Sequence, residues 1–215
     1  MEQLKVKAAK EALAYIDDNM IIGVGTGSTV NYFIKELAAI KNRIDACVAS
    51  SKATEGLLLA AGIPVIDLNA AGEVAVYIDG ADEVNHLHQM IKGGGGALTR
   101  EKILASAAQQ FICIVDERKV VKRLGAFPVS VEVIPMARSL VARALVHLGG
   151  NPQYREGLIT EIGNILVDGF DLDIDNPQVL EDSINVLPGV VENGIFARRI
   201  ADKVLVAYDN EVALL

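Results

Sequence analysis

In the first 127 residues, short runs of apolar residues alternate with stretches in which apolar residues recur at helical spacing. The amphipathic stretches predict helices, and the apolar runs, rich in Val and Ile, predict buried strands. The predicted helices are 4–16, 30–40, 54–61 and 98–108. The predicted strands are 20–25, 46–49, 65–67, 74–78 and 111–115. This alternation is typical of an α/β domain whose largely parallel sheet is covered by helices on both faces.

The rhythm changes after residue 127. The pattern predicts a strand at 129–133, a helix at 136–148 and strands at 153–156 (with an extension to 160 left open) and 165–168. A helix at 176–187 and a strand at 190–195 follow. This β-α-β-β-α-β order is that of a ferredoxin-like unit, and a last apolar run at 204–207 is expected to rejoin the first sheet. We therefore expect an α/β fold, a parallel-sheet Rossmann-like domain (1–127 plus 199–215) with an inserted small α+β ferredoxin-like domain (128–198).

Composition narrows the class of protein. Apolar residues make up 51% of the 215 and charged residues 22%, as in an ordinary globular protein. No apolar run approaches the roughly 18 residues that span a bilayer, and no targeting segment opens the sequence, so we expect a cytoplasmic protein without a membrane partner. The net charge of −8 argues against nucleic acid as a partner. It does not exclude a phosphorylated metabolite, because local amides and one or two lysines hold small anions.

The first candidate site is the segment 23–29, Gly-Val-Gly-Thr-Gly-Ser-Thr, between a predicted strand and a predicted helix. Such a turn presents backbone N–H groups and the positive end of a helix dipole to an anion. Neither nucleotide motif fits, because the dinucleotide pattern needs a glycine at Ser28 and an acidic residue where Ser50 and Ser51 stand, and the triphosphate loop needs a lysine. The segment therefore predicts a small phosphorylated ligand, with a ligand-free tight turn as the alternative.

Acidic residues follow the predicted strand 74–78, in the sequence Asp79-Gly-Ala-Asp-Glu83. Folds with a parallel sheet bind ligands at the carboxyl ends of the strands, so these carboxylates are candidates to hold sugar hydroxyls, move protons or bind a metal. An acidic surface turn is the alternative, since Asp and Gly are common in turns. The neighbouring candidates favour a site.

A run of four glycines, 93–96, lies between Lys92 and a predicted helix that contains Glu101. Glycine runs contribute no packing and cost backbone entropy on folding, so a linker is the usual interpretation. Between a strand-like stretch and a helix, however, the run suits a close approach of the backbone to a ligand. Glu101 is either a reactive carboxylate or an acid favoured by the helix dipole, and this segment alone does not decide between them.

The remaining candidates are weaker. Lys119 follows a predicted strand and can reach a phosphate, although a solvated turn is the common case for such a lysine. His86 and His88 have no diagnostic spacing and no second histidine cluster, so no metal site is predicted. Cys47 and Cys113 lie in apolar runs without a second cysteine nearby in sequence and are expected to be reduced core residues.

Taken together, these segments resemble the A-type ribose-5-phosphate isomerase family. The resembling segments are 23–29, 79–83, 92–95 and 97–102, with further support from 111–114, 131–138 and 187–190. Their order and separations are intact from near the N-terminus to about residue 200. One departure is Gly96, where many relatives have alanine, and it removes no functional group.

The resemblance implies interconversion of D-ribose 5-phosphate and D-ribulose 5-phosphate in the pentose phosphate pathway, without a cofactor or metal, by a homodimer or a dimer of dimers. It implies that Glu101 moves a proton between carbons 2 and 1 through a cis-enediolate, and that Lys92 stabilises the oxyanion. Asp79 and Asp82 would orient hydroxyls and assist opening of the furanose ring. The implied substrate contacts are Lys5, Thr26, Gly27, Ser28, Thr29, Gly80, Ala81, Gly93, Gly94, Gly95 and Lys119.

Two other classes of protein are alternatives to an isomerase. A sugar-phosphate sensor that regulates transcription would need a DNA-reading module, but only about twenty residues precede the first predicted strand and the chain has no basic patch. An amino-sugar phosphate deaminase or a coenzyme A transferase would need other residues in place of the segment from Lys92 to Glu101. Both classes fit the sequence less well than an isomerase.

Overall fold

The computed structural model describes residues 2–215, and the chain divides into two compact units. Unit 1 consists of Met1–Ala81, Arg100–Val120 and Ala201–Leu215, and unit 2 consists of Asp82–Thr99 and Val121–Ile200. The domain boundaries expected from the sequence, after residues 127 and 198, stay a prediction. Each unit has a sheet and a core of its own.

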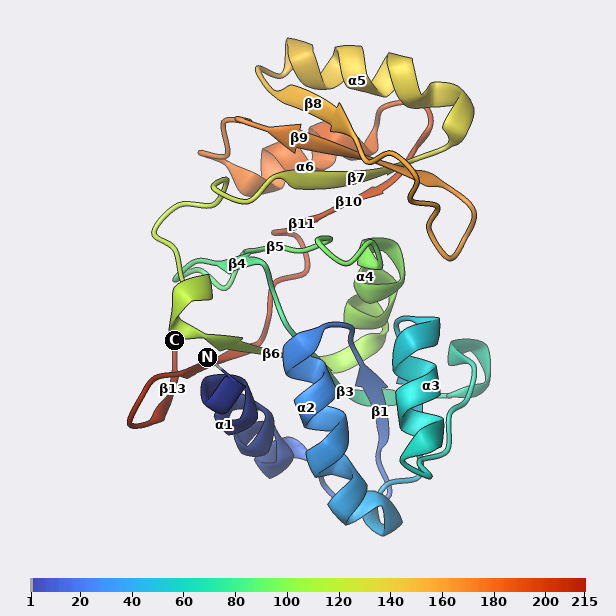
Figure 1. Ribbon diagram of the computed structural model, residues 1–215, viewed down its shortest axis with the longest axis vertical. Coiled ribbons are helices and arrows are strands. Elements are labelled where there is room, and N and C mark those ends of the chain that lie inside the picture. The colour runs from blue at the N-terminus through green and yellow to red at the C-terminus, as the bar shows by residue number, and fades with distance from the viewer. Residues whose placement is uncertain (1) are drawn as a thin grey trace. The chain divides into compact units, whose positions relative to one another are not determined.

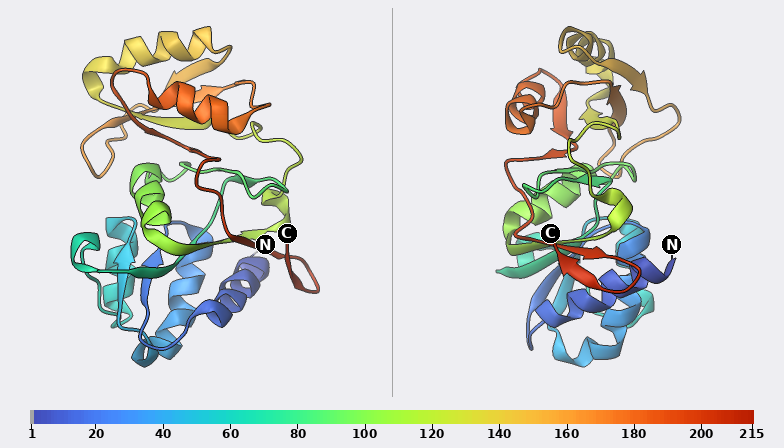
Figure 2. Two further views of the ribbon diagram at one scale, coloured as in Figure 1. Left: turned by 180° about the vertical axis from the view of Figure 1, so that it is seen from behind. Right: turned by 90° about the vertical axis from the view of Figure 1, so that its left-hand side faces the viewer.

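Unit 1 is built on a six-stranded sheet with the order β13-β12-β6-β3-β1-β2 (Figure 1). Its strands are β1 (Ile21–Val24), β2 (Ala46–Ala49), β3 (Val74–Asp79), β6 (Ala108–Asp116), β12 (Lys203–Ala207) and β13 (Val212–Leu214). All neighbours are parallel except β13, which pairs antiparallel with β12 at the edge (Figure 2). The predicted parallel sheet is confirmed, and β12 rejoins it as expected.

Four helices belong wholly or mainly to this unit: α1 (Glu2–Ala12), α2 (Ser28–Leu37), α3 (Lys52–Ala60) and α4 (Leu98–Ala107). Two views show α1 and α2 on one face of the sheet and α4 on the other (Figures 1 and 2). Side chains alternate across a strand, so Val76 and Ile78 join the core under α1 and α2, while Tyr77 points to the opposite face. The strand predicted at 65–67 is wrong, because only Val65 pairs, in an isolated bridge with Cys47.

Unit 2 contains the predicted β-α-β-β-α-β order around a four-stranded antiparallel sheet, β10-β7-β9-β8. Its elements are β7 (Val129–Val133), α5 (Arg138–His147), β8 (Asn151–Tyr154), β9 (Ile165–Phe170), α6 (Pro177–Asn185) and β10 (Val190–Asn193). Strand β8 starts two residues earlier than predicted and includes Pro152, which an edge strand tolerates. One core cluster joins α5 and α6 to the same face of the sheet, and the inserted α+β architecture is confirmed.

Three strands of two residues each form a small antiparallel sheet in unit 2, in the order β11-β5-β4. They are β4 (Glu83–Val84), β5 (Met90–Ile91) and β11 (Ile195–Phe196). The strand-like stretch expected before the glycine run is β5, whereas β4 was not predicted, because a two-residue strand has no periodicity to detect. Within residues 2–215, no helix is long and apolar enough to cross a membrane.

Candidate active site

The glycine-rich turn and Asp79 follow two adjacent parallel strands. Val24, the last residue of β1, lies opposite Ile78 of β3, so Gly25 and Asp79 are neighbours at the same edge of the sheet. The chain passes from β1 to β2 on one side and returns from β2 to β3 on the other. Open parallel sheets bind ligands at the carboxyl ends of strands where the connections diverge in this way. The structure of unit 1 therefore places both motifs at the expected position for a ligand.

The turn after β1 leads directly into α2, which begins at Ser28. Gly27 has a φ of 130°, a conformation that glycine adopts without strain. The first N–H groups of a helix have no acceptor within the helix, so this turn presents donors to an anion. Lys5 from α1 donates from Nζ to Ser28 Oγ at 2.7 Å, which brings a positive charge to the same place.

Asp79 is fully buried against this turn. Its Oδ1 accepts hydrogen bonds from Thr26 N at 3.1 Å and Gly80 N at 2.7 Å, and its Oδ2 accepts one from the hydroxyl of Tyr77. A Cβ on Gly25 would lie 2.0 Å from Asp79 Cγ. Gly25 is therefore required for the carboxylate to approach the turn.

Hydroxyl groups at the end of β2 surround Thr26. Thr26 Oγ1 lies 2.6 Å from Ser50 Oγ and donates to Ser51 Oγ at 2.8 Å. Thr54 donates to the carbonyl of Gly25 at 2.7 Å. Both serines and Thr54 are buried. In the sequence the two serines only exclude a dinucleotide site, and no local motif indicates that they support the turn.

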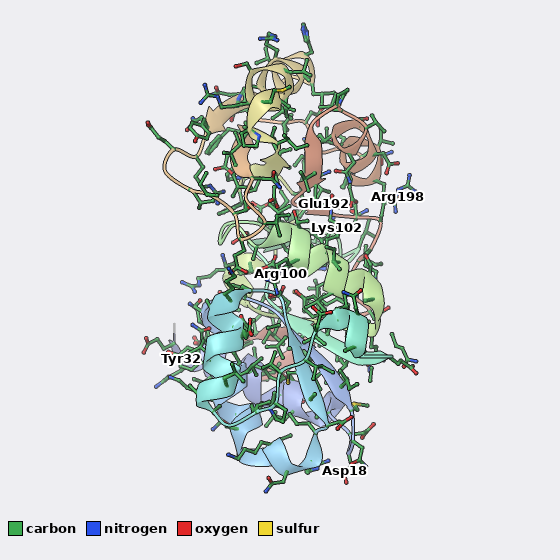
Figure 3. All side chains as sticks on the ribbon, turned by 90° about the vertical axis from the view of Figure 1, so that its right-hand side faces the viewer. Asp18, Tyr32, Arg100, Lys102, Glu192 and Arg198 are labelled. Carbon is green, nitrogen blue, oxygen red and sulfur yellow. The ribbon has the colours of Figure 1, made fainter. Side chains whose placement is uncertain are left out.

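Glu101 lies in the first turn of α4 and is only 5% exposed. Burial raises the pKa of Tyr77 well above its ordinary value, and the negative charges of Asp79 and Glu101 raise it further. Glu101 is therefore close enough to Tyr77 to act on it electrostatically. The preceding residue, Arg100, donates to the carbonyl of Ala49 at 3.0 Å and so ties the start of α4 to the end of β2 (Figure 3).

Lys119 follows β6, the strand next to β3, and is half-buried. Asp116, at the end of β6, accepts two hydrogen bonds of 2.8 Å from the side chain of Arg118. The hydrogen bond from Arg118 lowers the pKa of Asp116, and the charge of Lys119 contributes to the lowering. The positive charge of Lys119 therefore acts electrostatically on the carboxyl end of β6.

The other candidates belong to unit 2. Lys92 follows β5, is 3% exposed, and holds its ammonium 5.6 Å from the ring centroid of Phe196. Gly93 has a φ of 114°, and Gly94 N donates to Asp82 Oδ2 at 2.9 Å. The structure thus brings the glycine run together with the second acid of the Asp-Gly-Ala-Asp-Glu segment.

An unpredicted network supports the glycine run. Arg155 forms two hydrogen bonds with Asp168, of 2.8 and 2.5 Å, and donates from Nη1 to the carbonyl oxygens of Gly93 and Gly94, each at 3.2 Å. Ser130 donates to Asp168 at 2.8 Å. No motif marks these residues in the sequence, because they lie on strands or loops that are distant from the glycines along the chain.

Each predicted site residue has a place in one unit. Unit 1 carries Lys5, Thr26, Gly27, Ser28, Thr29, Asp79, Gly80, Ala81, Glu101 and Lys119, and unit 2 carries Asp82, Lys92, Gly93, Gly94 and Gly95. Among residues 2–215, no three His, Cys, Asp or Glu side chains are grouped as a bound metal requires. Activity without a metal or cofactor stays a prediction.

Comparison with known proteins identifies the family. The sequence model described as ribose 5-phosphate isomerase A (phosphoriboisomerase A) matches residues 46–211. The chain belongs to this family. A ribose-5-phosphate isomerase A of Legionella pneumophila (strain Lens) is 72% identical over 207 residues, which cover 96% of each chain. The predicted family is therefore confirmed.

Solved structures agree with this assignment. Ribose 5 phosphate isomerase A from Neisseria gonorrhoeae matches with a TM-score of 0.97 and 48% identity, over 100% of this chain and 96% of that one. A D-ribose-5-phosphate isomerase in complex with phospho-erythronic acid matches with a TM-score of 0.93 and 40% identity, over 100% and 98% of the two chains. These matches extend over both units, so they also confirm the predicted fold class.

Proposed function

We propose that this chain interconverts D-ribose 5-phosphate and D-ribulose 5-phosphate, as part of the pentose phosphate pathway, with Glu101 as the group that moves the proton. The family match and the relative of 72% identity support the reaction. The observation that supports the proton carrier is the position of Glu101, buried in the first turn of α4 and electrostatically coupled to Tyr77 at the end of β3.

The reaction needs one base that serves two adjacent carbons. Glu101 takes the proton from carbon 2 of the open-chain aldose, and the carbonyl oxygen becomes the oxyanion of a cis-enediolate. The same carboxyl group then returns the proton to carbon 1, while the hydroxyl proton of oxygen 2 passes to oxygen 1, which gives the ketose. Lys92 stabilises the oxyanion, because a buried ammonium interacts strongly with a charge that develops in the reaction.

The furanose form of the substrate must open before this step. Opening removes the proton from the hydroxyl on carbon 1, forms the carbonyl there, breaks the bond from carbon 1 to the ring oxygen and returns a proton to that oxygen. Asp79 and Asp82 are the carboxylates that we assign to the sugar hydroxyls and to this step. Gly80 and Ala81 lie between these two carboxylates in the chain, and we assign contacts with the sugar to them as well.

The phosphate group is bound by the turn before α2, through Thr26, Gly27, Ser28 and Thr29. Lys5 and Lys119 add positive charge, and Gly93, Gly94 and Gly95 allow the backbone to approach the sugar closely. Binding a phosphate remote from the reacting carbons fixes the chain so that carbons 1 and 2 reach the base.

The deciding experiment is isomerisation of ribose 5-phosphate by the purified protein, with and without a chelator, beside the Glu101→Gln variant. We expect activity that the chelator leaves unchanged and that falls about 100-fold or more in the variant, because a general base contributes about 10²–10⁴. Glu117 is exposed and follows β6. Glu117→Gln removes a charge of the same kind at a residue to which we assign no role in the site, so it is the matched control and should retain the activity. Near-normal turnover by Glu101→Gln would reject the base assignment.

We also propose that the protein works in the cytoplasm as a homodimer or a dimer of dimers, without a nucleic-acid or membrane partner. Exposed apolar side chains near the start of α5 support an interface in unit 2: Ile134, Met136 and Leu140, with Met136 92% exposed. Light scattering of the Met136→Glu variant tests this assembly, and an unchanged mass would place the interface elsewhere.

A further inference from the structure

We propose that Tyr77 and Asp79 are a positioning pair that holds the phosphate-binding turn in shape, and that Asp82 is the carboxylate that acts on the sugar. The inference rests on the proposed function, since it divides the work that was assigned jointly to Asp79 and Asp82. It concerns residues at the ends of β1, β2 and β3, all of them in unit 1, and one residue of unit 2.

Two of the three hydrogen bonds that Asp79 accepts come from backbone amides. A carboxylate offers about four acceptor positions, and three of them are occupied by Thr26 N, Gly80 N and the hydroxyl of Tyr77. Two of these donors belong to the segments that follow β1 and β3. Asp79 therefore links the phosphate turn to the end of β3, and little acceptor capacity remains for a sugar hydroxyl.

Tyr77 supplies the third donor and fixes the orientation of the carboxylate. Its side chain is fully buried, and its ring packs on Phe111 with the centroids 5.0 Å apart. Because burial and the nearby acids raise its pKa well above the ordinary value, its hydroxyl stays protonated and can donate throughout the physiological range. The phenol thus holds Oδ2 while the two amides hold Oδ1.

Ser50 connects this pair back to the turn. Ser50 lies close enough to the phenol of Tyr77 to lower its pKa, which partly opposes the effect of burial. The hydroxyl of Ser50 lies 2.6 Å from Thr26 Oγ1, while Thr26 N donates to Asp79. Tyr77, Asp79, Thr26 and Ser50 therefore form a chain of hydrogen bonds that runs through Thr26, the first residue after Gly25.

This chain of hydrogen bonds holds the turn in one conformation before the substrate arrives. Ordering one residue on binding costs about 1–2 kcal/mol, so a turn that is already ordered binds phosphate more tightly. Asp82 differs from Asp79 because it is half-buried and its Oδ2 accepts a hydrogen bond from one amide, Gly94 N. Its Oδ1 is the better placed carboxylate oxygen for the sugar.

The test is the split between KM and kcat for ribose 5-phosphate. Tyr77→Phe removes one hydroxyl, and we expect KM to rise about 10-fold with kcat within about 2-fold, because binding common to the ground and transition states is lost. Ser50→Ala should change KM in the same direction and also serves if Tyr77→Phe folds poorly. Asp82→Asn should instead lower kcat.

Phe111→Leu is the matched control, because it disturbs the packing of the Tyr77 ring and leaves the hydroxyl in place. We expect this variant to unfold at a lower temperature with an unchanged KM. A loss of kcat in Tyr77→Phe at unchanged KM, or no kinetic effect in either Tyr77→Phe or Ser50→Ala, would overturn the inference, as would a normal kcat in Asp82→Asn. Ser28→Ala distinguishes the proposed phosphate site from the proposed positioning role of Tyr77 and Asp79. If Ser28→Ala raises KM and Tyr77→Phe does not, the phosphate site is retained and the positioning role is rejected.

Discussion

Lys5 Nζ donates to Ser28 Oγ at 2.7 Å, across 23 residues of sequence. Lys5 belongs to α1 and Ser28 is the first residue of α2, the helix that follows the glycine-rich turn. The contact places an ammonium group at a helix N-terminus, where the helix dipole alone would repel it. A cation in this position is unfavourable unless an anion binds beside it, which is consistent with a phosphate-binding role for Lys5.

Replacing Lys5 by Met should therefore weaken substrate binding more than it slows turnover. We expect KM for ribose 5-phosphate to rise about 5-fold, with kcat within about 2-fold, because a charge-assisted hydrogen bond to an exposed phosphate is partly screened by water. Steady-state kinetics at low and at high salt measure the effect, which should shrink as salt increases. Lys10→Met, an exposed change on the same helix, is the control and should leave KM unchanged.

Lys119 is expected to act in the same way from the other side of β3. Lys119→Ala should raise KM about 10-fold, and Lys119→Arg should recover part of the affinity because it restores the charge. The neighbouring Lys122, which is exposed, gives the control variant Lys122→Ala. A large loss of kcat in Lys119→Ala at unchanged KM would contradict a role in phosphate binding.

The sequence was sufficient to predict the elements that have a clear period. The helices of both units are predictable because their apolar residues recur about every 3.6 residues. The buried strands of the parallel sheet are predictable because they are short apolar runs bounded by turn residues. The prediction of a strand at 65–67 is wrong because two apolar residues before an aspartate carry no information on pairing. Edge strand β13 was missed for the related reason that its residues are mostly half-exposed and have no clear pattern.

The candidate site was predictable where a motif is local and unpredictable where it is not. Residues 23–29 and 92–101 carry their chemistry in consecutive positions, whereas Tyr77, Ser50 and Arg155 become relevant only through contacts across the fold. Tyr77 looked like an ordinary strand residue because tyrosine is common in strands. A polar atom in an otherwise apolar strand was the one available signal for it, since a buried hydroxyl needs a partner.

The pair of Asp116 and Arg118 predicts a dependence of stability on pH. The hydrogen bond from Arg118 lowers the folded-state pKa of Asp116, so the pair stabilises the fold above the unfolded-state pKa of about 3.9. That contribution is lost as the pH falls through the lower folded-state value, where both states are protonated. Arg118→Gln should therefore reduce the free energy of unfolding at pH 7 and have a smaller effect below pH 4.

Urea unfolding of four proteins tests this expectation: the wild type, Arg118→Gln, Asp116→Asn and the double variant. The cycle isolates the interaction between the two side chains, because each single variant removes it. We expect the coupling to be favourable at pH 7 and to decline steadily with acidification below pH 4. A coupling of the same size at pH 7 and at the lowest pH at which the protein still folds would show that the charge of Asp116 does not contribute to the pair.

Arg155 gives the last prediction. Its guanidinium is held by Asp168, with the two side chains 21% and 13% exposed, and it donates to the carbonyls of Gly93 and Gly94. In a trans peptide the N–H points away from the C=O, so this contact turns the N–H of Gly95 away from Arg155. A flexible glycine run thereby presents an oriented amide, at the place where we propose that the sugar binds.

Arg155→Met should leave these carbonyls without their donor and leave Asp168 without its charge partner. We expect a loss of about 1–3 kcal/mol in the free energy of unfolding and a rise in KM of about 10-fold, because hydrogen bonds to charged groups are worth that much and the glycines regain their freedom. Hydrogen exchange should become faster at Gly95 and Gly96. Arg198→Met breaks an exposed pair with Asp182 and is the control, with little change expected in any of the three. Lower stability with unchanged KM and unchanged exchange would restrict Arg155 to a structural role.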